Sequence, residues 1–427
     1  MKTPKNPLPR LFSLKLAVGA LLVLLQGSSA MATTFYIAPS GSDSNAGTLA
    51  APFESITKAQ SVAASGDTVF LRGGTYSSFT IASSDTTYSY VHAIAKSGIS
   101  YLAYTGETPV FNFSSVSASA KRVCAFLVTG SNNTFQGFQV TGIQVGSQEQ
   151  SEGFRINSGS GNTFQHLKVH DCPAIGFYIQ KTASDTLVEN CDAYNLVGVS
   201  GVSAGNIDGF GCHSSGTGNI FRSCRSWHNS DDGYDCINAG GAVTFDHCWA
   251  YDNGLNGGNG NGFKVGGWGG QAQNKIPNPL PVHIVKFCLS ASNSSHGFYA
   301  NHHPGQAATW TNNTAYDNGG PDFDMLERTS PDYSSTSPQT NANDIAGIKE
   351  VMHNNLAYLG TITNDLNESG SIVSNNSWTK SVTISSADFQ STDATQITNG
   401  RHSDGSLPTI TFMHLVSGSD LSGLGCF

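Results

Sequence analysis

The sequence predicts an all-β chain folded as a parallel β-solenoid, and three observations carry this prediction. One motif of the form x-Gly-aromatic-x-apolar recurs through the middle of the chain, and a second motif, rich in Cys and Asn, lies between its copies. The 427 residues include 48 glycines and only 12% are charged, which is typical of a chain with many turns and few helices. Because a repeat of about two dozen residues cannot bury its own apolar face, such repeats stack as coils around one continuous core.

Residues 1–32 indicate a secretory signal peptide. Basic residues come first, then an apolar run, then a small-x-small cleavage site: Lys2, Lys5, Arg10 and Lys15; Leu16–Leu25; and Ala30-Met31-Ala32. An apolar run of this length is too short to span a bilayer, so we expect a secreted protein, extracellular or periplasmic, with no membrane contact. Loss of the four basic residues takes the formal charge from −9 to −13, which argues against nucleic acid as a partner.

Residues 33–427 are expected to form one domain, with its two ends different from its middle. Within residues 33–75, Ser55 can cap a short amphipathic helix that would cover the open end of the first coil. The apolar face of this helix would consist of Ile56, Ala59, Val62 and Ala63. DTVFLRGG (67–74) supplies the first strand, and residues 365–427 lose the repeat and are expected to fold back as a C-terminal cap.

The first motif defines a series of short strands. Its apolar residues alternate with other residues and are bounded by Gly, Asn and Asp, which indicates strands rather than helices. The copies are EGFRI (152–156), IGFYI (175–179), DGFGC (208–212), DGYDC (232–236), NGFKV (261–265) and HGFYA (296–300), with a degenerate copy at PDFDM (321–325). The glycines of successive full copies are 23 to 35 residues apart, so loops of different length should emerge between fixed strands.

The second motif aligns cysteines and asparagines in one column. Its members are Cys191, Cys224, Cys248, Cys288, Asn313 and Asn355. We expect a ladder at one bend of the coil, in which Cys acts as a small buried hydrophobe. This favours free thiols over the disulfides that nine cysteines in an exported chain would otherwise suggest. Cys212 and Cys236 form a second short column, whereas Cys124, Cys172 and Cys426 are left open, and no Cys or His spacing suggests zinc.

Alignment of the coils brings acidic residues together around the stretch NSDDGYDCINAGG (229–241). Asp208 and Asp232 occupy the same place before Gly-aromatic, while Asp235 and Lys264 share the place after the aromatic. In a strand, Asp235 and Lys264 then point away from the core, and Asp231 has the same parity. Asp208 and Asp232 have the parity of the buried aromatic, so they reach the same face only if the chain bends at the following glycine.

Four converging carboxylates suit a hard cation, and Ca²⁺ accepts them in flexible geometry more readily than Mg²⁺ does. The alternative is a solvated acidic face without a metal. Bound Ca²⁺ could hold a substrate carboxylate and acidify the neighbouring carbon-bound proton, which a neutral Lys264 could then remove. The outcome is β-elimination at a uronic acid. A cation would also explain how a protein of formal charge −13 holds an acidic polysaccharide.

At these residues the chain resembles the family 9 polysaccharide lyases, which include pectate lyases. The segments DGFG, NSDDGYD and GNGFKVGG occur in the same order and at similar spacing, and FYIAPSGSDSNAGT, DGSLP and GSDLSGLG also look like the family. The resemblance implies a right-handed parallel β-helix. It implies Asp208, Asp231, Asp232 and Asp235 as Ca²⁺ ligands and Lys264 as the base that takes the C5 proton of the uronate. It also implies pectate, or another acidic glycan, as substrate.

Two other functions compete with this interpretation. A polygalacturonase-type hydrolase is also a β-helix and could use Asp231 and Asp232 as acid and base, but the Gly-His-Gly and Arg-Ile-Lys segments of that class are missing. A non-catalytic β-helix that binds polysaccharide would need neither the lysine nor the acidic cluster.

Several further residues are candidates for substrate binding. Tyr299 follows Lys264 in the outward column, Asn301 and His302 lie close behind it, and Arg225 lies nearby. Stacking on sugars or hydrogen bonding to them is the functional interpretation, and an ordinary solvated surface is the alternative. The expected partner is an acidic polysaccharide, and we expect the protein to be a monomer.

Overall fold

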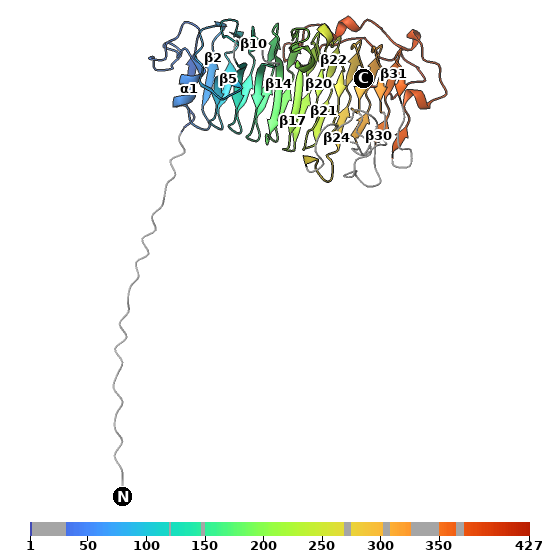
Figure 1. Cartoon of the computed structure of the whole chain (residues 1–427), viewed down its shortest axis with the longest axis horizontal. Helices are drawn as coiled ribbons and strands as arrows, with labels where there is room; N and C mark the ends of the chain where they lie inside the picture. Colours follow the sequence, from blue (N-terminus) through green and yellow to red (C-terminus); the bar gives the residue numbers. More distant parts are fainter. Residues whose placement is uncertain are drawn as a thin grey trace. The chain divides into compact units, whose positions relative to one another are not determined.

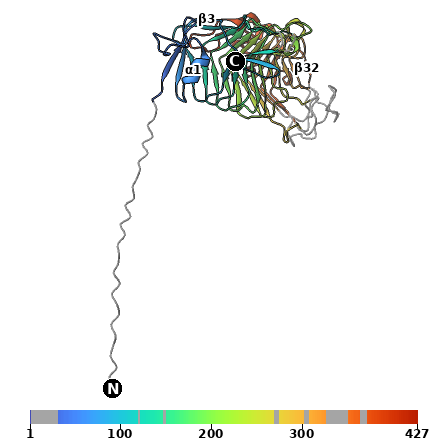
Figure 2. The same ribbon diagram turned by 60° about the vertical axis from the view of Figure 1, so that its left-hand side comes forward.

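The computed structural model describes residues 1, 31–118, 121–146, 150–268, 275–301, 308–325, 350–363 and 371–427. The contacts within the chain separate Met1–Ala32 from a second unit, Thr33–Phe427. Most of the predicted signal peptide therefore lies outside the described residues. Within Thr33–Phe427 the strands stack as successive coils of a parallel β-helix (Figures 1 and 2).

Each coil contributes one strand to each of three sheets, called sheets A, B and C. Sheet A contains β1 (Thr34–Ile37), β2 (Thr68–Leu71), β6 (Ser100–Ala103), β9 (Thr134–Gln136), β12 (Thr163–Gln165), β15 (Leu187–Glu189), β18 (Asn219–Arg222), β21 (Val243–Asp246), β24 (His283–Lys286), β27 (Ala308–Thr311), β30 (Glu350–His353) and β33 (Ile372–Ser374). Sheet B contains β3 (Gly74–Tyr76), β7 (Pro109–Asn112), β10 (Gln139–Thr141), β13 (Lys168–His170), β16 (Asp192–Tyr194), β19 (Arg225–Trp227), β22 (Trp249–Tyr251), β25 (Leu289–Ala291), β28 (Thr314–Tyr316) and β31 (Leu356–Tyr358).

Sheet C contains β4 (Ser83–Ser84), β5 (Tyr88–Ile94), β8 (Arg122–Val128), β11 (Glu152–Ile156), β14 (Ile175–Lys181), β17 (Phe210–Ser214), β20 (Tyr234–Asp235), β23 (Phe263–Lys264), β26 (Phe298–Tyr299), β29 (Phe323–Asp324) and β32 (Ile362–Thr363). Among the described strands, β4 and β5 pair antiparallel and the other pairs are parallel. The short helices are α1 (Ile56–Val62), η1 (Ala204–Asn206), η2 (Leu255–Gly257), η4 (Ser377–Thr379), η5 (Ser386–Asp388) and η6 (Ala394–Thr398).

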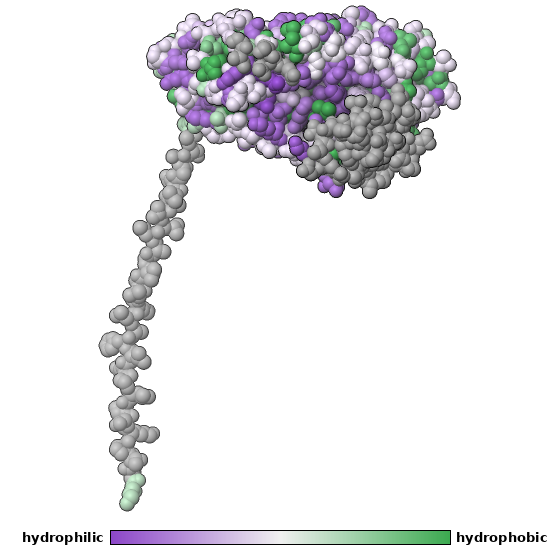
Figure 3. All heavy atoms as spheres, viewed as in Figure 1, coloured by the Kyte–Doolittle hydropathy of each residue, from purple (hydrophilic) through white to green (hydrophobic). Residues whose placement is uncertain are grey.

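The aromatic position of the first motif forms a stack of rings inside the coils. In sheet C, Phe210 pairs with Tyr234, Tyr234 with Phe263 and Phe263 with Phe298, as the motif predicts. Their ring centroids are 5.1, 4.5 and 5.0 Å apart, which matches the spacing of neighbouring strands. All four rings are fully buried, and each such burial contributes about 1.5–3 kcal/mol. On the face shown in Figure 3, the described hydrophobic residues lie in small separate groups among hydrophilic ones.

The cysteine and asparagine column is a ladder, as predicted. Cys224 Sγ donates to Val188 O (3.3 Å), and Cys248 Sγ donates to Phe221 O (3.4 Å) on the preceding coil. Further along, Cys288 N donates to Asn313 Oδ1 (3.0 Å), and Asn313 continues to the next coil. All nine cysteines are buried free thiols, including Cys124, Cys172 and Cys426. The same side chains therefore serve as core filling and as partners for backbone groups.

The N-terminal part differs in two details from the expectation. Ser55 Oγ caps α1 by accepting from Lys58 N (3.0 Å), and Ile56, Ala59 and Ala63 are buried. Val62 is 44% exposed rather than buried, because it lies on the solvent side of the last turn. DTVFLRGG is not the first strand, since β1 precedes it and pairs with β2 in parallel.

The C-terminal part also departs from the prediction. The repeat continues beyond residue 365, because β33 pairs with β30 in sheet A, and Trp378 packs on Phe323 at the end of the core. The following segment, orange to red in Figure 1, packs its apolar side chains against sheet B rather than only over the last coil. The outward residues of sheet B are apolar there, as at Trp249 and Leu289, and need this cover. Within the described residues, no helix is long and apolar enough to cross a membrane.

Candidate active site

The acidic residues and Lys264 lie on three neighbouring strands of sheet C. Asp208 precedes β17, Asp232 precedes β20, and Asp235 and Lys264 lie in β20 and β23. Asp235 pairs with Lys264 in register, so the predicted outward column is confirmed. Asp208, Asp231, Asp232 and Asp235 are at most 5% exposed, and the Lys264 side chain is 13% exposed.

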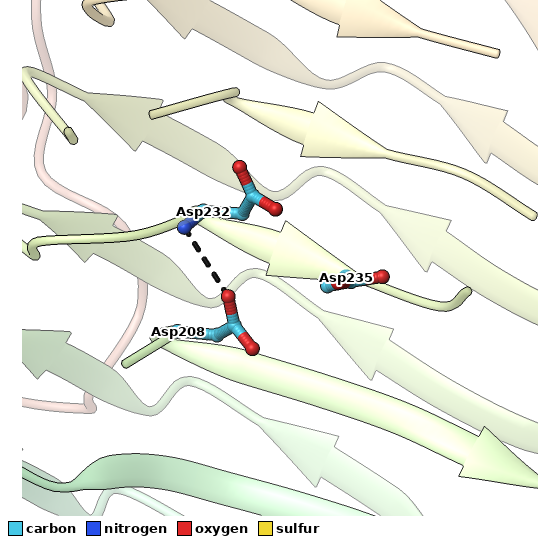
Figure 4. A group of neighbouring side chains, drawn as sticks. All are labelled: Asp208, Asp232 and Asp235. Carbon is cyan, nitrogen blue, oxygen red and sulfur yellow. Dashed lines mark hydrogen bonds between the residues drawn. The ribbon is translucent and has the colours of Figure 1, made fainter. Parts of the chain in front are cut away.

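The predicted bend at the glycines is confirmed. One carboxylate oxygen from each of Asp208, Asp232 and Asp235 lies within 4.8 Å of the others, and Figure 4 shows the three side chains on the same side of the strands. The chain bends at Gly209 and Gly233, and the next coil approaches Gly233 so closely that a Cβ there would lie 2.6 Å from Gly262 O. Asp231 adjoins this group without belonging to it, and its Oδ1 accepts from Asn259 N (2.7 Å).

Hydrogen bonds hold one oxygen of each carboxylate. Asp208 Oδ1 accepts from Asp232 N (3.2 Å), and Asp235 Oδ1 accepts from Ile237 N (2.6 Å). Asp232 Oδ1 accepts from both the main chain and the side chain of Asn261, at 2.8 and 2.7 Å. Lys264 Nζ contacts the second oxygens of Asp232 (3.2 Å) and Asp235 (3.1 Å). The second oxygens of Asp232 and Asp235 thus converge on the amine.

The negative charge in this cluster exceeds what one lysine can balance. Burial and the neighbouring carboxylates raise the pKa of Asp208 well above its usual value and the pKa of Asp231 to about 8. Burial also raises the pKa of Asp235, but Lys264 and His213 outweigh it, and that pKa is lowered. Burial lowers the pKa of Lys264, but the aspartates outweigh it and the pKa is raised. Buried carboxylates in excess of their counter-charges are what a divalent cation site provides, so the residues fit Ca²⁺.

Comparison with known proteins identifies the family of this chain. The family model "Pel9A-like, right handed beta helix region" matches residues 35–355, three quarters of the chain. The chain belongs to this Pel9A-like family. The predicted right-handed β-helix and the resemblance to family 9 polysaccharide lyases are thereby confirmed.

Individual members of the Pel9A-like family cover most of this chain. The pectate lyase L of Dickeya chrysanthemi is 31% identical over 401 residues, which cover 92% of this chain and 85% of the relative. The solved structure of a rhamnogalacturonan lyase is 36% identical with a TM-score of 0.82, covering 92% of this chain and 99% of that one. The crystal structure of pectate lyase Pel9A is 30% identical with a TM-score of 0.72, covering 91% and 90%.

The predicted substrate-binding residues of this Pel9A-like chain do not all lie near Lys264. Tyr299 pairs with Lys264 in the outward column and is 9% exposed. Asn301 is half-buried and donates through Nδ2 to Gly266 O (2.7 Å). Tyr299 lies in β26, one strand beyond Lys264 in sheet C, and Asn301 lies in the turn that follows β26. His302 lies outside the described residues.

The prediction for Arg225 is wrong. Arg225 belongs to β19 in sheet B and is 3% exposed. It forms a two-bond ion pair with Asp192, with both N–O distances 2.9 Å, and donates to Ile397 O and Asn399 O. Its guanidinium therefore holds the C-terminal segment and is not available to a substrate.

Three side chains beside the cluster were not identified from the sequence as site residues. His213 lies with Nε2 3.8 Å from Asp235 Oδ1, and its Nδ1 is 3.0 Å from the Tyr178 hydroxyl. Asn261 and His296 follow Asp208 and Asp232 in the column before Gly-aromatic. The motif alignment contained this signal for Asn261 and His296, because both immediately precede the motif glycine.

Proposed function

We propose that this protein is a calcium-dependent polysaccharide lyase that cleaves a galacturonate polymer, pectate in the first place, by β-elimination. The observation that carries the proposal is the buried cluster of Asp208, Asp231, Asp232 and Asp235 beside Lys264. The relatives named pectate lyase, at about 30% identity, support the reaction class.

Asp208, Asp232 and Asp235 would hold the cation, with Asp231 adjoining them. When bound, Ca²⁺ would neutralise the cluster, bind the uronate carboxylate and increase the acidity of the neighbouring C5 proton. The carboxylates are suited to this role because main-chain and amide donors already fix one oxygen of each.

Lys264 would act as the base. Its neutral Nζ would take the C5 proton, the released electron pair would form the C4–C5 double bond, and the bond from C4 to the glycosidic oxygen would break. The leaving oxygen would take a proton from solvent. Without a cation, the ion pairs with Asp232 and Asp235 keep Lys264 protonated. Lys264 can therefore act only when the charge of the aspartates is offset, which ties the base to the cation.

Rhamnogalacturonan is the second candidate substrate. The rhamnogalacturonan lyase structure is more similar to this chain than Pel9A is, in both identity (36% against 30%) and TM-score (0.82 against 0.72). Elimination at a galacturonate unit would use the same five residues in either polymer, so the substrate choice would depend on the groove on either side of Lys264.

We further propose that the chain is exported through the predicted signal peptide at residues 1–32 and works as a monomer on an acidic polysaccharide. The basic, apolar and small-residue regions of that segment support export. N-terminal sequencing of the protein from culture medium or periplasm would test it, and a mature chain that retains Lys2 would contradict it.

The experiment that tests the function is incubation with polygalacturonate and, separately, rhamnogalacturonan, each with Ca²⁺ and with a chelator. A lyase gives an unsaturated product that absorbs ultraviolet light, and we expect this absorbance with Ca²⁺ and its loss with the chelator. Saturated reducing ends would show a hydrolase. The absence of any product from either polymer would favour a non-catalytic polysaccharide-binding protein. Either of these two results would overturn the proposal.

A further inference from the structure

A polar ladder runs across four coils on the outer side of sheet C. It consists of Asp208, Asp232, Asn261 and His296, the residues that precede Gly-aromatic in successive copies of the first motif. At each step the main-chain N–H of one residue donates to the side-chain oxygen of the residue before it. The N–O distances are 3.2 Å from Asp232 to Asp208, 2.8 Å from Asn261 to Asp232 and 3.3 Å from His296 to Asn261.

Asn261 determines how the Asp232 carboxylate is turned. Its Nδ2 donates to Asp232 Oδ1 (2.7 Å), in addition to its main-chain N–H, so that one oxygen receives two hydrogen bonds. Asn261 is 3% exposed, and solvent cannot easily replace this bond. With Oδ1 occupied, Asp232 presents Oδ2 to the site, where it lies 3.2 Å from Lys264 Nζ.

His296 in turn fixes the Asn261 amide. Because Asn261 Nδ2 faces a carboxylate, Asn261 Oδ1 must face His296, whose Nδ1 lies 2.6 Å away and donates to it. His296 Nε2 lies 3.0 Å from Asp324 Oδ2, and the ring stacks on Tyr299 with centroids 4.5 Å apart. The two ring nitrogens of His296 therefore face two side-chain oxygens, Asn261 Oδ1 and Asp324 Oδ2.

We propose that Asn261 and His296 are positioning residues that orient the Asp232 carboxylate to bind a divalent cation. This inference rests on the proposed function in requiring that Ca²⁺ binds the cluster. Neither residue needs to touch the substrate, because both act through Asp232. Groups behind a metal ligand that hold its orientation typically change metal affinity 10–100-fold when removed.

The test is a calorimetric titration of chelator-treated protein with Ca²⁺, using the variants Asn261→Leu and His296→Phe. Asn261→Leu removes the amide donor, whereas His296→Phe keeps a ring that can stack on Tyr299 but removes both ring nitrogens. We expect 10–100-fold weaker Ca²⁺ binding in each. Weaker Ca²⁺ binding by His296→Phe would assign the effect to the lost ring nitrogens, because the stacked ring is kept. His296→Asn, which restores one N–H donor, should recover much of the affinity.

The chain offers a matched control on another sheet. His170 in β13 has the same kinds of partner, with Nδ1 2.7 Å from Asp171, Nε2 2.9 Å from Gln139 and its ring stacked on Tyr194 at 4.9 Å. His170→Phe should leave Ca²⁺ affinity unchanged. At saturating Ca²⁺, we expect the kcat of His296→Phe to stay close to that of the parent, while the Ca²⁺ concentration for half-maximal activity rises.

Three results would count against the inference. If the folded Asn261→Leu and His296→Phe variants bind Ca²⁺ with an affinity within twofold of the parent, the inference is overturned and the proposed function is not affected. The same loss of affinity in His170→Phe would also overturn it, since the effect would then not be local. A parent protein that binds no Ca²⁺ would overturn the proposed function together with this inference. If Asn261→Leu does not fold, His296→Phe provides the same decision.

Discussion

Two buried clusters of charge lie on different sheets of this solenoid and are balanced differently. On sheet B, Asp192 is 2% exposed and lies between Arg225 and Arg401, with N–O distances of 2.9 and 2.8 Å. On sheet C, the buried Asp208, Asp231, Asp232 and Asp235 lie beside Lys264, which forms ion pairs with Asp232 and Asp235. Both clusters are removed from water, so burial alone does not distinguish them.

The two clusters differ in the direction in which their environments shift the carboxyl pKa. Burial raises the pKa of Asp192, but Arg401 and Arg225 outweigh it, and that pKa is lowered. At Asp208, burial and neighbouring carboxylates act together and raise it. Arg401 also donates to Cys191 O and Ser223 O, so the Asp192 cluster is saturated and attaches the C-terminal segment. The comparison teaches that uncompensated charge, rather than buried charge, distinguishes the candidate site from the structural cluster.

The largest expected effect is on activity and concerns Lys264, which pairs with two aspartates of the sheet C cluster. Lys264→Ala should lower turnover by about 10³-fold, within the range for loss of a general base, with the fold retained. Lys264→Arg should also fail largely, because a guanidinium stays charged at any working pH. The control is Lys286→Ala on sheet A, where the amine pairs with Asp246 at the surface. Substantial turnover by Lys264→Ala at saturating Ca²⁺ would assign the base to another residue.

The same substitution in the two clusters should change stability in opposite directions. Asp192→Asn leaves two buried guanidinium groups without a counter-charge and should destabilise the fold by about 3–5 kcal/mol. Asp208→Asn relieves repulsion and should stabilise the metal-free protein by about 1 kcal/mol. Denaturant unfolding in the presence of a chelator measures both. Equal destabilisation by the two variants would contradict the contrast in charge balance.

His92 extends the comparison to a buried group with no counter-charge. It is 4% exposed among Phe79, Phe111 and Phe126, and burial lowers its pKa to about 3. Within the described part of the chain, neither ring nitrogen has a hydrogen-bond partner. The folded chain therefore stays neutral at His92, while the unfolded chain takes up a proton below about pH 6.5. Stability should fall as pH drops through 6.5, by about 3 kcal/mol at pH 4.5. Unfolding of His92→Phe should lack this loss, and an identical pH profile in both proteins would contradict it.

A further effect concerns the stability of the parent protein in Ca²⁺. Ca²⁺ at about 100 times its Kd should stabilise the fold by about 2.7 kcal/mol, since a cation that binds only the folded chain shifts the equilibrium towards it. The melting temperature should rise accordingly with Ca²⁺ and fall with chelator. Asp192→Asn should show the same increase as the parent, whereas Asp208→Asn should show less. Equal increases in melting temperature in all three proteins would contradict a Ca²⁺ site in the sheet C cluster.

The sequence predicted the fold and the core of the site because both depend on positions within a repeat. The motif glycine fixes the position of the buried ring. Asp235 and Lys264 each occupy the position directly after that ring, so their pairing could be predicted from the motif. The prediction for Arg225 failed because alternation along a strand says that a side chain points outward, but not what covers that face. The C-terminal segment that covers it shares no repeat with sheet B, so its contact with Ile397 and Asn399 could not be read from the motifs.

For Asn261 and His296, the sequence predicted the position but not the role. Their positions were visible in the alignment, directly after Asp208 and Asp232 in the same column. Their role depends on which atom each side chain offers to its neighbour, and this became visible only with the hydrogen bonds of the polar ladder. Column positions could be predicted from the sequence, whereas the orientation of an amide or an imidazole could not.

The measurement that tests the central claim most directly is calorimetric titration of the chelator-treated parent with Ca²⁺, beside the double variant Asp232→Ala, Asp235→Ala. If uncompensated charge on sheet C makes the cation site, the parent should bind one Ca²⁺ per chain and the double variant should lose that affinity. Undiminished Ca²⁺ affinity in the double variant would place the cation elsewhere and contradict the account.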